Sequence, residues 1–312
     1  MKLTDNKNNF QELITLTAMW RNIPEDAVKR DFYIIMMLQR LEQSEYAKNC
    51  VFKGGTSLSK AYPGSIERFS EDIDLTFISD EELTSKQYSR ILKNIEKLMA
   101  KGGILNKIPD ERNDRNKSAF ILWDEDDRSK IKLEIGSSVR PDPYEKKTIK
   151  TYIQEYLEYI ENDEAIEKYE LNPITLNTLR IERTFVDKVM AVKRHACCGS
   201  LQSKVRHIYD VVMLYDMPEI QHFLQDKKEL KRLLSLTKDT DSYYLDKRGI
   251  AKEYDPKAAF NFNIWKKYFD RNIEKRYEEL HKDLLYTDEK QDFSKAIDIF
   301  NKLNGIFTEI DE

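Results

Sequence analysis

Residues that make turns are scarce in this chain of 312 residues, which contains 9 glycines and 8 prolines. Such a composition favours long helices over a turn-rich β fold. The three cysteines, Cys50, Cys197 and Cys198, are odd in number and match no zinc-binding spacing. We therefore expect reduced thiols in a cytoplasmic protein.

Long apolar runs and an excess of positive charge are also missing. No run of about 18 apolar residues occurs, and the first ten residues contain no apolar stretch of signal-peptide length, so we expect no membrane partner. The chain has 52 Lys and Arg against 56 Asp and Glu, a formal net charge of −4. A global positive field is therefore absent, and contact with RNA or DNA would need a local patch.

The residues that are present predict a globular α+β protein. Hydrophobic residues make up 40% of the chain, and its length allows one large core or two modest ones. The first half alternates helical and strand patterns, whereas the second half is mostly helical. We therefore predict a small mixed sheet with flanking helices over residues 1–165 and a mainly helical domain over residues 166–312.

Hydrophobic periodicity and turn signals place the individual elements. We expect helices at 10–20, 25–44, 57–62, 79–100, 182–197, 201–216, 217–237, 263–286 and 292–308. The helix after residue 78 is expected to open at the capping box Ser79-x-x-Glu82. We expect strands at 50–53, 72–78, 118–124, 130–137 and 174–181, with 118–124 and 130–137 forming an antiparallel hairpin, and irregular structure at 103–117 and 239–262.

A glycine pair lies between the first predicted strand and the short helix after it. In Phe52-Lys-Gly-Gly-Thr-Ser-Leu-Ser59, Gly54 and Gly55 let the backbone approach a ligand, and the helix N-terminus offers N–H groups to a phosphate. Further donors are available from Lys53, Thr56, Ser57, Ser59 and Lys60. Taken alone, the pattern is more typical of a tight strand-to-helix turn.

Two carboxylates lie on one face of the strand predicted at 72–78. Side chains alternate along a strand, so Asp72 and Asp74 share a face while Ile73, Leu75 and Phe77 point to the core. Adjacent carboxylates repel each other unless a cation lies between them. Magnesium binds one or two carboxylates together with substrate phosphates, which predicts a Mg²⁺ or Mn²⁺ site; the alternative is a solvated strand face.

A third carboxylate occurs in Lys130-Ile-Lys-Leu-Glu-Ile-Gly136. Glu134 lies on a strand whose other face is apolar. If this strand lies beside the Asp72 strand, Glu134 could bind the metal or accept a proton from an attacking hydroxyl. The alternative is an exposed glutamate on an edge strand.

Two predicted helices meet at Gly199, with Lys188 eleven residues before it and Asp210 eleven residues after it. In an antiparallel helix pair these two side chains lie side by side. The stretch around them contains five cations and no acid between Lys188 and Tyr209, which predicts a local anion-binding patch. The alternative is a structural ion pair between Lys188 and Asp210.

Four motifs in this order resemble the AbiEii family, nucleotidyltransferase-like toxins of bacterial abortive-infection and type IV toxin–antitoxin systems that are related to the MenT toxins. They are Phe52-Lys-Gly-Gly-Thr-Ser-Leu-Ser-Lys60, Arg68-Phe-Ser-Glu-Asp-Ile-Asp-Leu75, Glu182-Arg-Thr-Phe-Val-Asp-Lys188 and Arg206-His-Ile-Tyr-Asp-Val211. The sequence departs from the family pattern at Asp187, where glutamate is more common, and in the longer insert between Gly55 and Asp72.

The resemblance implies a nucleotidyltransferase-like catalytic domain with a C-terminal domain that completes the active site. It implies that Asp72 and Asp74 bind the metal, that Gly54, Gly55 and Ser57 face the phosphates, and that Lys188 and Asp210 belong to the active site. The substrate would be a nucleoside triphosphate, the acceptor the 3′ end of tRNA, and the outcome growth arrest. An AbiEi-like antitoxin encoded nearby is the implied partner.

Other functions stay open at this point. Nucleotidyl transfer to a protein or a small molecule uses the same motifs. A non-catalytic binding module would predict missing carboxylates, yet all three are present. An R-x₄-H spacing, Arg276 to His281, matches that of HEPN ribonucleases.

Ser70 lies two residues before Asp72. A phosphate there would add roughly −1.5 to −2 charges beside the carboxylate pair. Some relatives are silenced by phosphorylation of active-site hydroxyls, so we predict Ser70, or otherwise Thr56 or Ser57, as a regulatory phosphosite. The alternative is that Ser70 only hydrogen-bonds the local turn, and an antitoxin can also act without modifying the chain.

Overall fold

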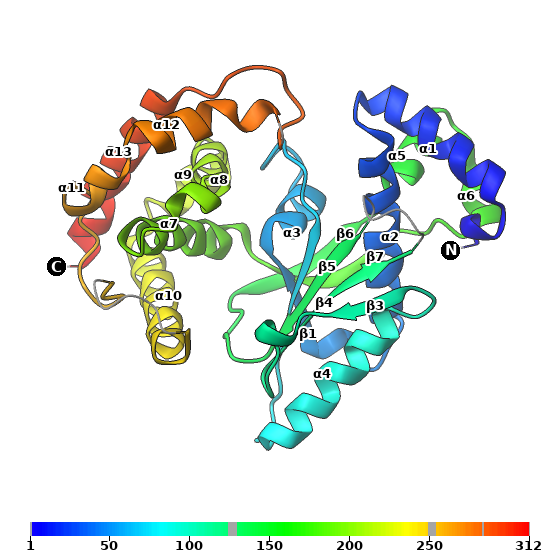
Figure 1. Cartoon of the computed structure of the whole chain (residues 1–312), viewed down its shortest axis with the longest axis horizontal. Helices are drawn as coiled ribbons and strands as arrows, with labels where there is room; N and C mark the ends of the chain where they lie inside the picture. Colours follow the sequence, from blue (N-terminus) through cyan, green and yellow to red (C-terminus); the bar gives the residue numbers. More distant parts are fainter. Residues whose placement is uncertain (1, 124–129, 249–253, 283, 312) are drawn as a thin grey trace. The chain divides into compact units, whose positions relative to one another are not determined.

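The computed structural model describes residues 2–123, 130–248, 254–282 and 284–311, which form two compact units (Figure 1). We call Met1–Ala61 with Phe69–Leu179 the sheet unit, and Tyr62–Arg68 with Arg180–Glu312 the helical unit. The division expected near residue 165 thus falls at Leu179, because the last strand belongs to the sheet. The chain also passes once into the helical unit, at Tyr62–Arg68, and returns.

The sheet unit is built on seven strands in the order β3-β4-β5-β2-β1-β7-β6. Neighbours β2 and β5 are parallel, as are β1 and β7, and the other neighbours are antiparallel. The mixed sheet, the β4–β5 hairpin and the place of the Glu134 strand beside the Asp72 strand are all as predicted. The strands are β1 Cys50–Lys53, β2 Asp72–Phe77, β3 Ile104–Lys107, β4 Asn116–Leu122, β5 Ile131–Gly136, β6 Tyr144–Ile149 and β7 Ile174–Leu179.

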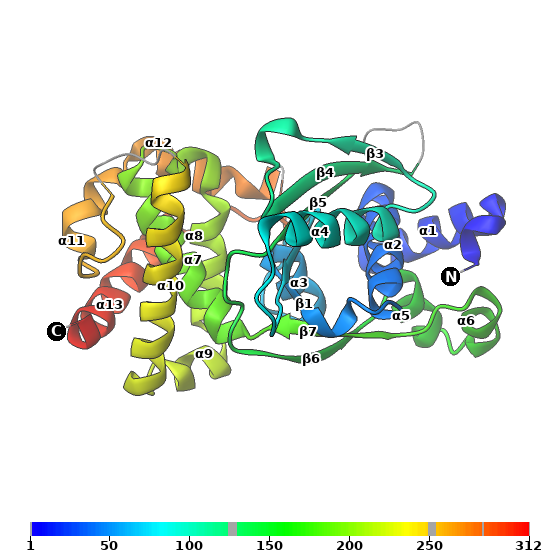
Figure 2. The same ribbon diagram turned by 90° about the horizontal axis from the view of Figure 1, so that it is seen from below.

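Helices and short 3₁₀ turns connect these strands. They are η1 Leu3–Asp5, α1 Lys7–Arg21, α2 Glu25–Glu42, η2 Ala47–Asn49, α3 Gly54–Ala61, α4 Ser85–Met99, η3 Pro109–Glu111, α5 Tyr152–Tyr159 and α6 Asp163–Tyr169. Helix α4 lies against one face of the sheet (Figure 2). That face carries Phe77, whose ring contacts Tyr88 of α4. The alternating apolar residues of β2 and β5 are buried on that face, which leaves the opposite face to the polar side chains.

Two local predictions for the sheet unit are wrong. Helix α4 starts at a capping box five residues later than expected, where Thr84 accepts a hydrogen bond from the Gln87 N–H. Ser79 instead forms a turn with Glu81. Residues 103–117 contain strand β3, which was expected to be loop. Strands β3 and β6 lie at the edges of the sheet, where mostly exposed side chains remove the alternating pattern that marks a half-buried strand.

The helical unit consists of helices and 3₁₀ turns in the described residues. They are α7 Ile181–Cys197, η5 Leu201–Lys204, α8 Arg206–Tyr215, α9 Pro218–Phe223, α10 Lys227–Arg248, α11 Phe262–Trp265, η6 Lys266–Tyr268, α12 Arg271–Glu278, η7 Glu279–Lys282 and α13 Phe293–Asp311. Helices α7 and α8 pack together after the turn at Gly199, as predicted. Buried aromatic side chains, among them Phe262, Trp265 and Phe300, pack α11 against α13.

Three helix predictions in this unit need correction. The single helix expected at 217–237 is interrupted at residues 224–226, between α9 and α10. Helix α10 continues to Arg248, into the stretch expected to be irregular, of which residues 249–253 lie outside the described residues. The single helix expected at 263–286 is interrupted, because Asp270 accepts hydrogen bonds from the N–H groups of Asn272 and Ile273 and starts α12. Within the described residues, no helix combines the length and apolar character needed to cross a bilayer.

Candidate active site

The glycine turn at the start of α3 lies directly against a carboxylate of the sheet unit. Gly54 has φ +85°, and a Cβ atom there would collide with Asp74 Oδ2 and lie 3.0 Å from Asp74 Cγ. Glycine is therefore required for both conformation and space. The first turn of α3, which includes Gly55, leaves backbone N–H groups available to an anion close to Asp74.

The hydroxyls after the glycines hold the turn in place. Thr56 Oγ1 donates to the Asp72 carbonyl oxygen and lies 2.9 Å from Ser70 Oγ. Ser57 Oγ donates to the Gly54 carbonyl oxygen at 2.9 Å. Both Thr56 and Ser57 are buried, so their side chains fix the turn.

Charged residues form a row across the polar face of the sheet. Strand register pairs Lys53 with Asp74 and Asp74 with Glu134, so neighbouring strands present these side chains on one face. Asp72 lies one step along β2 on the same face. The three carboxylates therefore lie on one face of neighbouring strands, as predicted, and Lys53 places a positive charge at the end of the row.

Glu134 already has a cationic partner that the sequence analysis did not single out. Lys132, two residues before it and opposite Asp72 in the register, forms an ion pair with Glu134 and another with Glu111 at 2.8 Å. Burial would lower the pKa of Lys132, but hydrogen bonds to the two carboxylates outweigh it and raise the pKa. The i, i+2 spacing of Lys132 and Glu134 on one strand was the signal for this pair.

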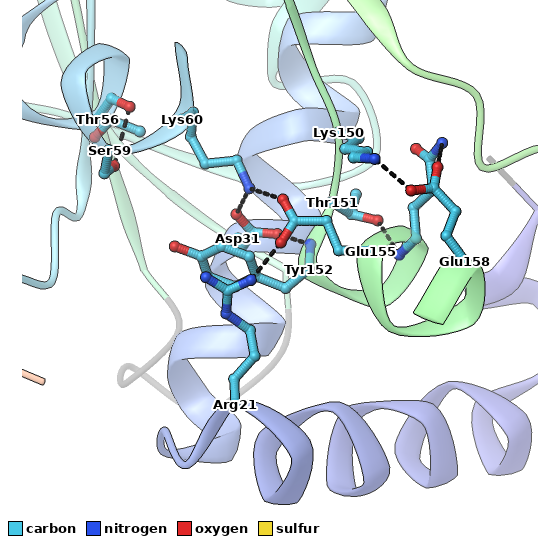
Figure 3. Close-up of polar contacts among 11 residues, drawn as sticks. Arg21, Asp31, Thr56, Ser59, Lys60, Lys150, Thr151, Tyr152, Glu155 and Glu158 are labelled. Carbon is cyan, nitrogen blue, oxygen red and sulfur yellow. Dashed lines mark hydrogen bonds and ion pairs between the residues drawn. The ribbon is translucent and has the colours of Figure 1, made fainter. Parts of the chain in front are cut away.

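Lys60, considered as a phosphate donor from the sequence, is used elsewhere in the sheet unit (Figure 3). Its ammonium group lies 2.7 Å from Asp31 on α2, is buried, and lies over the Tyr152 ring of α5. Asp31 also accepts from the Tyr152 N–H at 2.7 Å. Lys60 therefore joins α3 to α2 and α5, and its ammonium group is not available to bind a phosphate at the glycine turn.

We expect Gly54→Ala to lose most nucleotide transfer, because the new methyl group would displace Asp74. The matched control is Gly64→Ala, since Gly64 has φ +78° but nothing within 4 Å of an added Cβ. Both variants suffer the backbone penalty, about 1 kcal/mol or more of unfolding free energy. Thermal melts and transfer rates compare them, and equal rates in the two variants would contradict the close approach to Asp74.

The helical unit contains a buried cluster of charges around Asp210. This carboxylate is 0% exposed and accepts from Arg68 Nε at 2.6 Å and Arg68 Nη2 at 2.9 Å. Lys188 Nζ lies 2.8 Å from Asp210 Oδ2 and 3.2 Å from His207 Nδ1. Lys188 and Asp210 are thus side by side as predicted, but the bidentate partner of Asp210 is Arg68, which the sequence could not pair with it.

Burial and charge act in opposite directions on the pKa values of this cluster. Burial would raise the pKa of Asp210, but the positive charges of Arg68 and Lys188 hold it well below its usual value. Burial lowers the pKa of Lys188, and Asp210 opposes that shift. The pKa of His207 is lowered well below 6.5 by burial and by the charge of Lys188, so His207 is neutral at pH 7.

We expect the protein to lose stability as the pH falls below about 6.5. Burial, together with Arg194 and Lys204, lowers the pKa of His195 to about 4, and the pKa of His207 is also lowered. The unfolded chain therefore binds protons between pH 6.5 and 4 that the folded chain does not, and unfolding becomes easier. Melting temperatures between pH 7.5 and 4.5 should decline less steeply in His195→Asn, whereas an unchanged slope would contradict the assignment.

At least three of the five cations that predict an anion-binding patch on α7 and α8 have partners within the protein. Lys188 is paired with Asp210, Lys193 donates to the carbonyl oxygens of Ala258 and Ala259, and Arg194 is paired with Asp241. These contacts hold the helical unit together. Asp187 stands where the family more often has the longer glutamate. Its carboxylate accepts hydrogen bonds from Arg183 and Thr237, which also belong to the helical unit.

Comparison with known proteins identifies the family. The family model "Nucleotidyl transferase AbiEii toxin, Type IV TA system" matches residues 37–299. The chain belongs to the AbiEii family. It is therefore a nucleotidyltransferase of the toxin class, which confirms the resemblance noted in its motifs. No curated protein matches the chain.

Solved structures include proteins similar to this AbiEii chain. The nucleotidyltransferase toxin MenT4 of Mycobacterium tuberculosis H37Rv superposes with a TM-score of 0.57 at 18% identity, covering 95% of this chain and 89% of that chain. JHP933 of Helicobacter pylori gives a TM-score of 0.39 at 19% identity, covering 83% of this chain and 95% of that chain. The MenT4 likeness supports the fold of the AbiEii chain and is not used to assign residue roles.

Proposed function

We propose that this AbiEii toxin transfers a nucleotidyl group from a nucleoside triphosphate to the 3′ end of tRNA and so blocks translation. The observation that carries the proposal is the contact between the glycine turn and Asp74. It brings phosphate-binding N–H groups next to a carboxylate pair, which is the arrangement that a metal-bound triphosphate needs.

The carboxylates suit Mg²⁺ or Mn²⁺ because both ions prefer oxygen ligands. Among the described residues, no three His, Cys, Asp or Glu side chains are grouped closely enough to hold a metal ion by themselves. Asp72 and Asp74 would therefore hold the ion together with phosphate oxygens of the substrate. When bound, the ion would neutralise charge on the phosphates during transfer.

In the proposed reaction the acceptor hydroxyl attacks the α-phosphorus of the triphosphate. One P–O bond forms to the acceptor, the bond to the β-phosphate breaks, and pyrophosphate leaves. The hydroxyl proton would pass to Glu134 or to water. Lys132 pairs with Oε1 of Glu134, so Glu134 could take this role, or that of a metal ligand, through its other oxygen or after Lys132 shifts to its second partner, Glu111.

The family resemblance assigns Lys188 a contact with the nucleotide. An ammonium group has three N–H donors; one of those of Lys188 is matched by Asp210, and a second by His207 when Nδ1 of that ring carries no proton. One donor thus remains for a phosphate or a base. We propose that Arg68 and Asp210 are positioning residues that fix the direction of Lys188.

The deciding experiment incubates the protein with each α-labelled nucleoside triphosphate, total tRNA and total protein. We expect label in the tRNA pool, dependence on a divalent metal and release of pyrophosphate. Label found only in protein or in small molecules would show that the acceptor is not tRNA. The absence of label from every pool would reject nucleotidyl transfer. Ribonuclease action rests on the Arg276 to His281 spacing alone, whereas nucleotidyl transfer is supported by the glycine turn and the carboxylate pair.

Family membership implies an antitoxin partner, and we propose that Ser70 is a site through which it acts. Ser70 is only half-buried, yet it also has the local contact with Thr56 that the alternative predicted. We expect Ser70→Asp to lose toxicity and Ser70→Ala to escape silencing by modification. The intact mass of the toxin co-expressed with its genomic neighbour is the measurement. No added phosphate on a neutralised toxin, or full toxicity in Ser70→Asp, would reject the site.

A further inference from the structure

Helix α4 presents a line of positive charges to solvent. Four exposed cations recur at i, i+4, i+7 and i+11, which places them on one face of the helix over roughly 16 Å. We call them the cationic stripe: Lys86, Arg90, Lys93 and Lys97. Glu96 is the only acid on α4, and it is buried and bound to Arg112, so it does not offset the stripe.

The stripe lacks the partners that cations have elsewhere in the protein. Within residues 2–123, 130–248, 254–282 and 284–311, none of the four forms an ion pair or a side-chain hydrogen bond. On α10, by contrast, Lys227, Arg232 and Lys238 are each paired with a carboxylate. Like charges at i, i+4 destabilise a helix, so an unpaired stripe of this kind works against the stability of α4.

The rest of α4 holds the stripe in a fixed position. Leu92, Ile95 and Met99 are 0% exposed and anchor the opposite face of the helix, and the capping box at Thr84 fixes its start. The stripe is therefore a rigid surface that carries four positive charges.

We infer that the cationic stripe binds the phosphate backbone of an RNA acceptor. Neutralisation of successive phosphates by Lys and Arg is the main source of affinity for nucleic acids. An anionic membrane would need exposed apolar residues beside the cations, and a protein partner would need an aromatic or apolar centre. None of the exposed large hydrophobic side chains of the described residues lies on α4.

The position of the stripe indicates a long ligand. Helix α4 packs on the apolar face of the sheet, whereas Asp72 and Asp74 lie on the opposite face. A nucleotide in the active site cannot reach the stripe, but an acceptor as large as tRNA can contact both. The choice of RNA over other polyanions rests on the proposed function.

The test compares two variants that each lose four positive charges, which changes the formal net charge from −4 to −8. The stripe variant carries Lys86→Gln, Arg90→Gln, Lys93→Gln and Lys97→Gln. The control carries Lys266→Gln, Lys267→Gln, Arg271→Gln and Lys275→Gln on the helical unit. Binding of a fluorescein-labelled tRNA transcript is followed by anisotropy across a salt series, and melting curves confirm that both variants fold.

We expect the stripe variant to bind the transcript at least about tenfold more weakly at 0.1 M salt, and the control within about twofold of the parent protein. The slope of log Kd against log salt should fall by about 3 in the stripe variant only, since each phosphate contact contributes about 0.7–0.9. Equal RNA affinity in the two variants would overturn the inference. The stripe would then bind an acidic protein or only contact solvent.

Transfer kinetics separate this inference from the proposed function. In the stripe variant the KM for tRNA should rise while kcat stays within about twofold. Unchanged KM with active transfer would reject the stripe and keep the function. If RNA binding depends on the stripe but no RNA receives a nucleotide, the inference that the stripe binds RNA stands and tRNA is rejected as the acceptor.

Discussion

Asp72→Asn and Asp74→Asn are each expected to lower nucleotide transfer by at least roughly a hundredfold while the protein stays folded. A bound metal ion supplies several kcal/mol of transition-state stabilisation. Each 1.4 kcal/mol corresponds to a factor of ten in rate. Removing one carboxylate leaves too little negative charge to hold the ion, and neither side chain is part of the buried core.

The control for this prediction is Asp80→Asn, an exposed aspartate just beyond β2. Initial rates are measured across a magnesium titration, together with a melting curve for each variant. A folded Asp72→Asn or Asp74→Asn protein that keeps the parent rate at every metal concentration would remove these residues from the metal site.

The largest expected effect on stability comes from Asp210→Asn. The substitution keeps the shape of the side chain but removes the carboxylate charge that Arg68 and Lys188, two buried cations, both contact. Breaking a buried ion pair in this way costs about 3–5 kcal/mol of unfolding free energy. For a protein of this size that corresponds to a fall in melting temperature of roughly 10 °C.

A matched control is Asp216→Asn at the end of the same helix. Asp216 pairs with Lys295 at 2.7 Å, but both side chains are more than half exposed, so the expected loss is about 0–1 kcal/mol. Adding Lys188→Met to Asp210→Asn should recover part of the lost stability, because it removes one of the two buried cations that contact the Asp210 carboxylate in the parent protein. Equal melting temperatures for the two asparagine variants would show that the Asp210 cluster does not stabilise the fold.

These expectations differ from those based on the sequence alone. Spacing about Gly199 places Lys188 beside Asp210, and the family resemblance implies that both belong to the active site. The spacing carries no information about Arg68, which lies 142 residues from Asp210 in the chain. Contacts at such separations depend on the path of the whole chain, so local pattern cannot predict them.

The sheet face was predictable because its periodicity is strong. Alternation along 72–77 and 131–135 correctly separated the carboxylates from the buried residues on both strands. Two capping-box patterns stand five residues apart, at Ser79 and Thr84, and only the surrounding packing decides which one starts α4. The partner of Lys60 was also not predictable from its local sequence, because Asp31 lies on helix α2, outside the glycine motif.

The route of the chain through Tyr62–Arg68 has a consequence for how this protein can be divided. The sheet unit contains two separate stretches of sequence, and the segment between them supplies Arg68 to the buried carboxylate of the helical unit. A gene fragment ending at Leu179 therefore carries away a residue that the remaining fragment needs to neutralise Asp210. The two halves can be inherited, truncated or recombined only together, unlike domains joined by a single linker.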